Sequence, residues 1–336
     1  MKKITSCSLV IGSILLLLLP SLLFATSIEA THATILIVST RNHFLPFSGD
    51  LYRAGGYTEV GYDRPSALPT CITNREIVIY VHGWMADEEY DEEHFMVQFP
   101  SAVTQFNIVK ESLDSVGYNQ PVIGFSWDSD TFWNTAKRIA DQNGLKLAKF
   151  ILDLKAACED AKIRLVGHSL GARVILNALY ELHTNRDLVT ENGVSWNDPN
   201  KNYKITSVHL LGAAVNPEEV SIAQGFGIPI REEVEQFHNK YSTEDTVLET
   251  AYRDEERPHI ALGEEGAHGM AAGLENIYHE QEVSSQIPLD RNGDGRFTIP
   301  PDKANHMRYA GIINRNGLWI DEGVMDIVVL QDWRNQ

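Results

Sequence analysis

The chain is poor in basic residues, in cysteine and, beyond Phe24, in long apolar runs. Its 28 lysine and arginine residues face 46 aspartate and glutamate residues, which gives a net charge of −18. A nucleic-acid partner requires a basic patch or stripe, so this balance argues against one. No stretch after Phe24 is long enough to cross a bilayer. Neither an internal repeat nor a linker is evident, and 43% of the residues are hydrophobic. We therefore expect residues 34–336 to form a single domain with a large core.

The N-terminus carries the one long apolar run. Lys2 and Lys3 precede the segment Leu9–Phe24, and small residues suited to cleavage follow at Ala25, Ala30 and Ala33. This order is typical of a secretory signal peptide, so we assign residues 1–30 to a signal and expect a secreted or extracytoplasmic protein. An uncleaved run would instead tether the protein to a membrane.

The three cysteines are Cys7, Cys71 and Cys158, and the first lies inside the signal. An exported chain with two remaining cysteines can form one disulfide. Cys71 and Cys158 each precede a predicted strand by a few residues. If those strands are neighbours in a parallel sheet, the two sulfurs lie at the same end of it. Two separate buried thiols are the alternative.

Apolar runs typical of buried strands alternate with segments of helical spacing, which predicts a parallel sheet with crossover helices. Arg41–Thr70, rich in Gly, Pro and Tyr, predicts loops and one edge strand. The predicted strands are Thr34–Ser39, Ile77–Val81, Pro121–Trp127, Ile163–Val166, Ile205–Leu211, Val234–Tyr241 and Asn276–Val283; the helices are Val103–Val116, Thr135–Leu154 and the segment up to Leu182, with Glu322–Trp333 as a last helix or strand.

A nucleophile pattern, Gly-X-Ser-X-Gly, spans Gly167 to Gly171 between a predicted strand and a predicted helix. A turn this sharp leaves no room for bulky neighbours, which explains the two glycines. Ser169 then lies at a helix N-terminus, where backbone amides favour developing negative charge. We interpret Ser169 as an acyl-accepting nucleophile; an ordinary Gly/Ser turn is the plainer interpretation.

Three strand ends in this order, His82-Gly83-Trp84, Phe125-Ser126-Trp127 and the Ser169 turn, resemble the α/β-hydrolase superfamily, most closely its lipase- and esterase-like serine hydrolases. The resemblance implies an α/β fold, with a mostly parallel central sheet and helices on both faces. It also implies that the oxyanion is held by backbone amides of Leu170 and Trp84, with Met85 as the next candidate.

The resemblance further implies the chain order serine, acid, histidine. The acid follows a strand closely in that family, and Asp245, after the strand Val234–Tyr241, resembles that position. Its rivals are Glu244, Glu218 and Glu219, and a helix N-cap is the plainer role for Asp245.

The base must be a later histidine. His306 resembles the family's His-X-X-Tyr tail, because Tyr309 follows it at the right spacing. His268 lies in a Gly/Ala-rich loop, His279 lies within a predicted strand, and His259 completes the set of rivals. A surface histidine without a role remains the plainer interpretation of each.

Residues 290–302 resemble the start of an EF-hand or dockerin-type calcium loop. Alternating oxygen ligands and a glycine for the sharp turn carry the resemblance, but position twelve of the loop is Pro301 where the bidentate glutamate should stand. Such an ion would brace the loop that carries His306, whereas a plain acidic turn is the alternative. The expected calcium ligands are Asp290, Asn292, Asp294, Arg296 through its backbone, and Thr298.

Together these features predict an exported hydrolase of carboxylic esters, acting on a small-molecule or lipid ester through an acyl-enzyme. No cofactor is expected for catalysis. Thioesterases, amidases and peptidases share the resemblance, and a non-catalytic binding module is an alternative of another class. Segments 184–204 and 214–233 are long enough to act as lids.

Overall fold

The computed structural model describes residues 35–65, 76–86, 101–201, 203–269, 271–287, 305–313 and 319–333. All of them belong to one compact unit, Ile35–Gln336. A second unit, Met1–Thr34, holds the predicted signal and lies outside the described residues.

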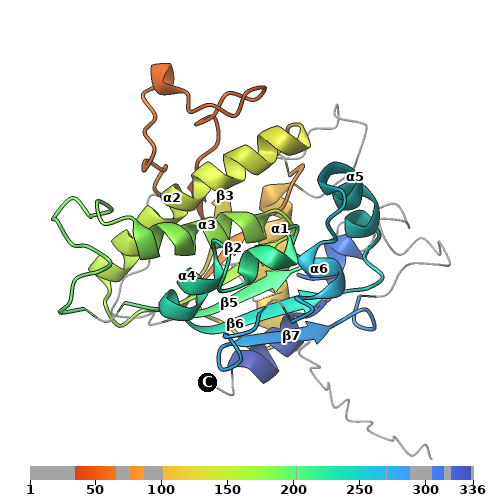
Figure 1. Cartoon of the computed structure of the whole chain (residues 1–336). Helices are drawn as coiled ribbons and strands as arrows, with labels where there is room; N and C mark the ends of the chain where they lie inside the picture. The colour runs from red at the N-terminus through yellow and green to blue at the C-terminus, as the bar shows by residue number, and fades with distance from the viewer. Residues whose placement is uncertain are drawn as a thin grey trace, which may run out of the picture. The chain divides into compact units, whose positions relative to one another are not determined.

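A seven-stranded sheet forms the centre of the described unit, with the order β1-β3-β2-β4-β5-β6-β7 (Figure 1). All six strand pairings within it are parallel, as expected for strands joined by helical crossovers. The strands are β1 (Leu36–Ser39), β2 (Glu76–Val81), β3 (Val122–Ser126), β4 (Lys162–His168), β5 (Ile205–Leu211), β6 (Val234–Tyr241) and β7 (Tyr278–Glu282), with a separate antiparallel pair, β8 (Ile312–Ile313) and β9 (Trp319–Asp321).

Helices cover both faces of the sheet. One core packs the long helices α2 and α3 against it, and a second core packs α1 and the C-terminal helix against the opposite face (Figure 1). The helices are α1 (Ala102–Ser115), α2 (Trp133–Ala157), α3 (Gly171–Thr184), α4 (Gly227–Glu233), α5 (Arg253–Glu256), α6 (Leu262–Glu265) and α7 (Met325–Ile327), with 3-10 turns η1 (Arg53–Gly55), η2 (Pro217–Val220) and η4 (His306–Arg308) and π-helical turns η3 (Leu248–Tyr252) and η5 (Val328–Trp333).

The apolar runs explain why these strands form. Ile77, Ile79 and Val81 of β2 point into the α2/α3 core, and Val78 and Tyr80 point into the opposite core. A strand covered on both faces needs apolar residues at every position, which is the continuous pattern seen in the sequence.

The predicted elements agree with the structure except at a few places. The described part of Arg41–Thr70 contains loops, isolated bridges and the turn η1, so the predicted edge strand is wrong there. Glu322–Trp333 forms α7 and η5, which settles the helix-or-strand alternative. Helices α4, α5 and α6 and strands β8 and β9 were not predicted, because elements of two to seven residues carry little periodicity.

Parallel strands place all their carboxyl ends at one edge of the sheet. The segments after β2, β4 and β6 carry Trp84, Ser169 and Asp245, so the topology gathers them along that edge. Within the described ranges, none of the helices combines the length and apolar character needed to cross a membrane.

Candidate active site

Ser169 occupies a strained turn between β4 and α3. Its φ of 54° lies in the left-handed region that side-chain-bearing residues avoid. The turn is held in place, because the Ser169 amide donates to Leu211 O at 3.0 Å and the Ser169 carbonyl accepts from Ala214 N at 3.1 Å. These bonds to the end of β5 fix the strained residue, and Ser169 is 7% exposed.

Glycine at 171 is required by a close approach of two backbones. A Cβ built on Gly171 would meet the carbonyl oxygens of Val81 and His82, the latter at 2.6 Å. A Cβ on Gly167 would lie 2.7 Å from the side chain of Ile175. The end of β2 therefore presses directly against the start of α3, which places the segment after β2 beside Ser169.

The structure brings Asp245 and His306 together, although 61 positions separate them. His306 Nδ1 lies 2.7 Å from Asp245 Oδ2, and the two side chains are 3% and 0% exposed. A buried contact of this length is a strong hydrogen bond that fixes both the tautomer and the orientation of the imidazole. The second ring nitrogen, Nε2, is thereby left to act as a proton acceptor.

Each oxygen of the Asp245 carboxylate has its own donors. Oδ1 accepts from the amides of Val247 and Leu248, at 3.2 and 3.1 Å. Oδ2 accepts from His306 and from the hydroxyl of Tyr309 at 3.3 Å. Burial raises the pKa of Tyr309 well above its ordinary value, and the nearby Asp245 carboxylate raises it further, so the hydroxyl stays protonated and can donate.

His168, the residue before Ser169, positions His306. Its Nε2 lies 2.7 Å from the His306 carbonyl, and the two rings are 4.8 Å apart. Burial lowers the pKa of His168 to about 3, so the ring is neutral and its one proton is on Nε2 when it donates to that carbonyl. Nothing in the sequence singles out His168, because any side chain can fill the second position of the nucleophile pattern.

Asn305 joins the acid and base segments. Its Nδ2 donates to the Glu244 carbonyl, and its Oδ1 accepts from Thr246 at 3.4 Å and from the His306 amide at 3.0 Å. Sequence reasoning also missed this residue; its position immediately before the candidate base was the only signal.

No hydrogen bond joins Ser169 Oγ to His306 within the part of the chain that the structure describes. The two residues are nevertheless neighbours, because His168 adjoins Ser169 and contacts His306 directly. Catalytic hydrogen bonds are often long or poorly aligned in the free enzyme and shorten when substrate binds.

The rival residues do not join this arrangement. Glu219 binds Arg173 at 3.1 Å, and the Glu218 amide donates to Asn216 Oδ1 at 3.1 Å. The carboxylate that His306 Nδ1 contacts is that of Asp245, the neighbour of Glu244. His279 lies on β7 against Gln236, and His268 is 60% exposed beside Glu265. His259 is exposed after α5.

The two expected oxyanion donors are available. Among the described residues, the backbone amides of Trp84 and Leu170 have no hydrogen-bond acceptor. The Met85 amide, by contrast, donates to Ser129 O at 3.2 Å, which favours Trp84 over Met85. The His82 ring shapes this segment: its Nδ1 contacts Gly83 O at 2.9 Å, and its Nε2 accepts from the Trp127 amide at 3.1 Å.

Several predicted features lie at or beyond the limits of the described residues. Cys158 is disulfide-bonded, and its expected partner Cys71 lies outside them. The two cysteines precede β2 and β4, which are adjacent and parallel, as the predicted pairing requires. The calcium loop 290–302 also lies outside the described residues.

The two candidate lid segments contact each other through one hydrogen bond. Trp196 Nε1 of segment 184–204 donates to Glu233 Oε2 of segment 214–233 at 2.7 Å, and Glu233 Oε1 lies 2.7 Å from His183 of α3. Trp196 is buried in the α2/α3 core. Movement of these segments stays a prediction.

A sequence model for the family described as "Alpha/beta hydrolase of unknown function (DUF900)" matches residues 70–253. The chain belongs to this family. The match covers more than half of this α/β hydrolase, from the segment before β2 to the segment after Asp245, and it confirms the fold expected from the strand ends. No curated protein matches the chain.

Solved structures similar to this hydrolase include lipases and esterases. Aspergillus fumigatus lipase B is 13% identical, with 67% of this chain and 48% of that chain covered and a TM-score of 0.37. A cutinase-like protein from Cryptococcus sp. is 14% identical, with 73% and 88% covered and a TM-score of 0.32. Esterase B from Lactobacillus rhamnosis is 10% identical, with 65% and 66% covered and a TM-score of 0.34. Similarities this weak say nothing about the substrate.

Proposed function

We propose that this α/β hydrolase cleaves carboxylic esters, with Ser169 as nucleophile, His306 as base and Asp245 as the acid that orients it. The observation that carries the proposal is the buried 2.7 Å contact between His306 and Asp245. It lies beside a serine with a φ of 54° at the same edge of the sheet. A strained backbone at a serine next to a buried His–Asp pair is a costly arrangement that a plain turn would not need.

The proposed reaction follows from which nitrogen carries the proton. His306 Nδ1–H donates to Asp245, so Nε2 can accept the proton of Ser169 Oγ as that oxygen attacks the ester carbonyl. The carbonyl oxygen becomes negative and is stabilised by the amides of Leu170 and Trp84. His306 then returns its proton to the departing alkoxide, which leaves the acyl group on Ser169. Water, deprotonated by His306, releases the acid in a second cycle.

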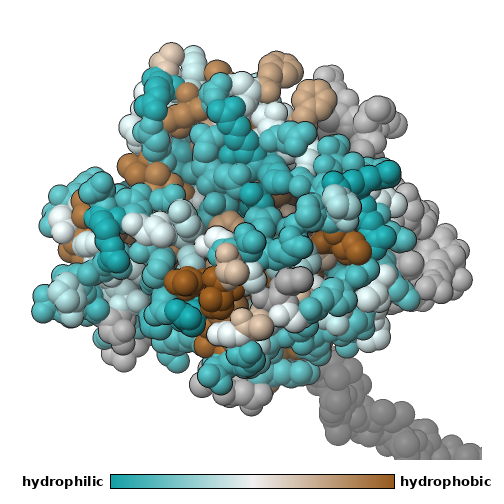
Figure 2. Space-filling model, in the orientation of Figure 1, coloured by the Kyte–Doolittle hydropathy of each residue, from teal (hydrophilic) through white to brown (hydrophobic). Residues whose placement is uncertain are grey.

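The polarity of the molecular surface favours small esters as the first substrates to test. On the face shown in Figure 2, apolar residues form small separate patches within a mostly hydrophilic surface. We prefer ester hydrolysis to thioester or amide hydrolysis because the turn has the sequence Gly-His-Ser-Leu-Gly, which resembles the turn of lipases and esterases. The fold itself does not fix the substrate.

We also propose that the protein acts outside the cytoplasm, after export through its N-terminal segment. The disulfide bond of Cys158 supports this, because such bonds persist in oxidising compartments. Mass analysis of the N-terminus of protein from culture medium, membranes and cytoplasm tests it. A start after Ala25, Ala30 or Ala33 supports export with cleavage, whereas protein that retains Met1 in the cytoplasmic fraction contradicts export.

Labelling of the purified mature protein with a fluorophosphonate probe tests the proposed chemistry. We expect the wild type and the control Ser285→Ala, an exposed serine, to be labelled, and Ser169→Ala to remain unlabelled. A series of chromogenic esters of increasing acyl length would then define the preference. If the folded wild type takes no label, the chain is better interpreted as a binding module.

A further inference from the structure

Three histidines lie side by side across β5, β6 and β7, away from Ser169. His209 is in register with His238, and His238 is in register with His279. Their rings are 4.4 Å apart in the first pair and 5.0 Å apart in the second. His209 is fully buried and His279 is exposed, so the row runs from the core to the surface.

The C-terminal turn η5 brings a carboxylate to the buried end of this row. Asp332 Oδ2 lies 3.1 Å from His209 Nε2 and 3.5 Å from His238 Nδ1. One ligand atom from each of the three residues falls within 4.8 Å of the others. In a tetrahedral zinc site the bonds are about 2.0–2.2 Å long, which separates neighbouring ligand atoms by roughly 3.3–3.5 Å. The distances from Asp332 Oδ2 to the two histidine nitrogens, 3.1 and 3.5 Å, are close to that spacing.

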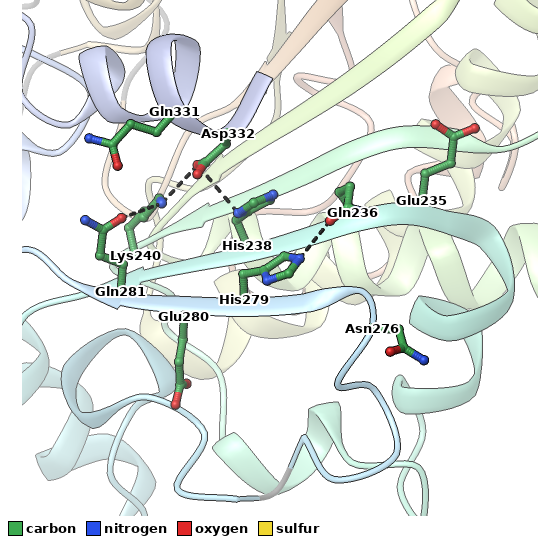
Figure 3. Close-up of a pocket in the computed structure, with 10 residues that line it drawn as sticks. All are labelled: Glu235, Gln236, His238, Lys240, Asn276, His279, Glu280, Gln281, Gln331 and Asp332. Carbon is green, nitrogen blue, oxygen red and sulfur yellow. Dashed lines mark hydrogen bonds and ion pairs between the residues drawn. The ribbon is translucent and has the colours of Figure 1, made fainter. Parts of the chain in front are cut away.

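A pocket of about 640 Å³ gives access to this cluster. Figure 3 shows His238, Lys240 and Asp332 pointing toward one another within it, whereas His279 turns toward Gln236 (Figure 3). The side chains of His238 and Asp332 are 8% and 11% exposed, so an ion can reach them from the pocket. The same opening leaves room for water as a fourth ligand.

The three side chains are also of the types that transition metals bind. The imidazole nitrogens of His209 and His238 and one carboxylate oxygen of Asp332 face a common point. Two neutral imidazoles and one carboxylate form a ligand set that Zn²⁺ and similar ions favour.

We propose that His209, His238 and Asp332 form a binding site for a divalent transition metal, with Zn²⁺ as the ion that the ligand set fits best. The site is separate from the proposed catalytic residues and independent of the calcium loop expected at 290–302. The ion would tie the C-terminal turn η5 to the two strands β5 and β6.

Lys240 competes with the metal. Its ammonium lies 2.9 Å from Asp332 Oδ2 and 2.9 Å from Gln281 Oε1, so it neutralises the carboxylate in the described structure. A bound cation must displace it from Asp332, and Gln281 can retain it. Removing the ammonium should therefore strengthen metal binding.

The test titrates chelator-stripped, purified full-length protein with Co²⁺, followed by visible absorption, and with Zn²⁺, followed by calorimetry. We expect wild type to bind one ion with a tetrahedral Co²⁺ spectrum. His238→Gln and Asp332→Asn should each weaken binding by about a hundredfold or more, since even the loss of a supporting partner costs about 10–100-fold. Lys240→Gln should strengthen binding by about tenfold or more, because it removes a like charge a few ångströms away.

His279→Gln is the matched control, because it alters the same row of histidines outside the ligand cluster. It should leave the affinity unchanged. Absence of a Co²⁺ spectrum and of Zn²⁺ binding in the wild type would overturn the proposal, as would binding that survives both ligand substitutions or depends on His279. Labelling of the same samples by fluorophosphonate reports on Ser169 separately, so either proposal can fail alone.

Discussion

At the scale of single residues, the candidate site depends on the hydrogen-bond donors to the Asp245 carboxylate. Its two oxygens receive two backbone amides, one imidazole and one phenol, so the carboxylate has no freedom to turn. A carboxylate fixed in this way dictates that His306 carries its proton on Nδ1. The rival Glu244 is the preceding residue, and only the folded structure shows that the carboxylate in contact with the imidazole is that of Asp245.

Asp245→Asn should lower kcat by about 10⁴-fold, because an amide in place of the carboxylate favours the wrong imidazole tautomer. The side-chain oxygen of asparagine can still accept from Val247 and Leu248, so the fold should persist. Steady-state kinetics on the best chromogenic ester, with circular dichroism as the folding check, measures this effect. Glu244→Gln is the matched control and should retain activity within about twofold, because the carboxylate that contacts His306 is that of Asp245. Comparable losses in both variants would contradict the assignment of the acid.

At the scale of elements, the contact between β2 and α3 sets the position of Ser169, the proposed nucleophile. The glycine at 171 lets the carbonyls of Val81 and His82 approach the first turn of the helix. That approach brings the segment after β2, which carries the proposed oxyanion donor Trp84, next to the turn after β4. The same neighbouring strands explain why Cys71 and Cys158 can share one end of the sheet.

Gly171→Ala should destabilise the protein by roughly 1–3 kcal/mol, the cost typical of overpacking, and should abolish labelling of Ser169. The added methyl would meet backbone oxygens, which cannot move aside as a side chain can. Urea unfolding and the fluorophosphonate assay measure the two effects. Gly225→Ala provides the control, since nothing lies within 4 Å of its added methyl. An unchanged unfolding midpoint in Gly171→Ala would show that β2 and α3 are less close than described.

At the scale of the whole molecule, burial of neutral histidines in and around the sheet has a consequence for acid stability. The unfolded chain takes up protons on these rings near pH 6.5, but burial delays uptake in the folded chain to lower pH. Below pH 6.5 the unfolded state therefore binds more protons, and the free energy of unfolding falls as the pH falls. Burial lowers the pKa of His43, His82, His168, His209 and His238.

Chelator-treated wild type should accordingly lose stability between pH 6.5 and pH 4, by about 1.4 kcal/mol per pH unit for each histidine that stays neutral when folded. Denaturant unfolding across this range gives the slope. His168→Asn should reduce the slope by about one histidine's share, because the folded-state pKa of His168 is about 3. His268→Ala, at an exposed position, should leave the slope unchanged. A flat profile in wild type would be incompatible with neutral buried rings.

The calcium loop is also a question for the whole molecule, since an ion at 290–302 would brace the segment before His306. We predict that Ca²⁺ raises the melting temperature of the EGTA-treated protein by several degrees, through its preferential binding to the folded state. Asp290→Ala and Asp294→Ala should not respond. A melting temperature that ignores Ca²⁺ in wild type would favour a plain acidic turn.

The sequence was most informative where a structure depends on a pattern of residues close together in the chain. The ranges of β5 and β6, Ile205–Leu211 and Val234–Tyr241, agree with the prediction at both ends. Gly167, Ser169 and Gly171 were identifiable because a sharp turn restricts residue type. The roles of Asp245 and His306 were predicted from a resemblance. The contact between the two side chains supports that prediction.

Amino-acid order alone determined the alternation of strands and helices, and with it a parallel sheet whose carboxyl ends meet at one edge. Only the tertiary structure decided which distant side chains touch. Strand register and the paths of the loops determine the pairing of His306 with Asp245 and its support from His168. They also determine the ligand cluster of His209, His238 and Asp332. Hydrophobic periodicity is a property of neighbours along the chain, whereas a hydrogen bond across 61 or 138 positions is decided by packing.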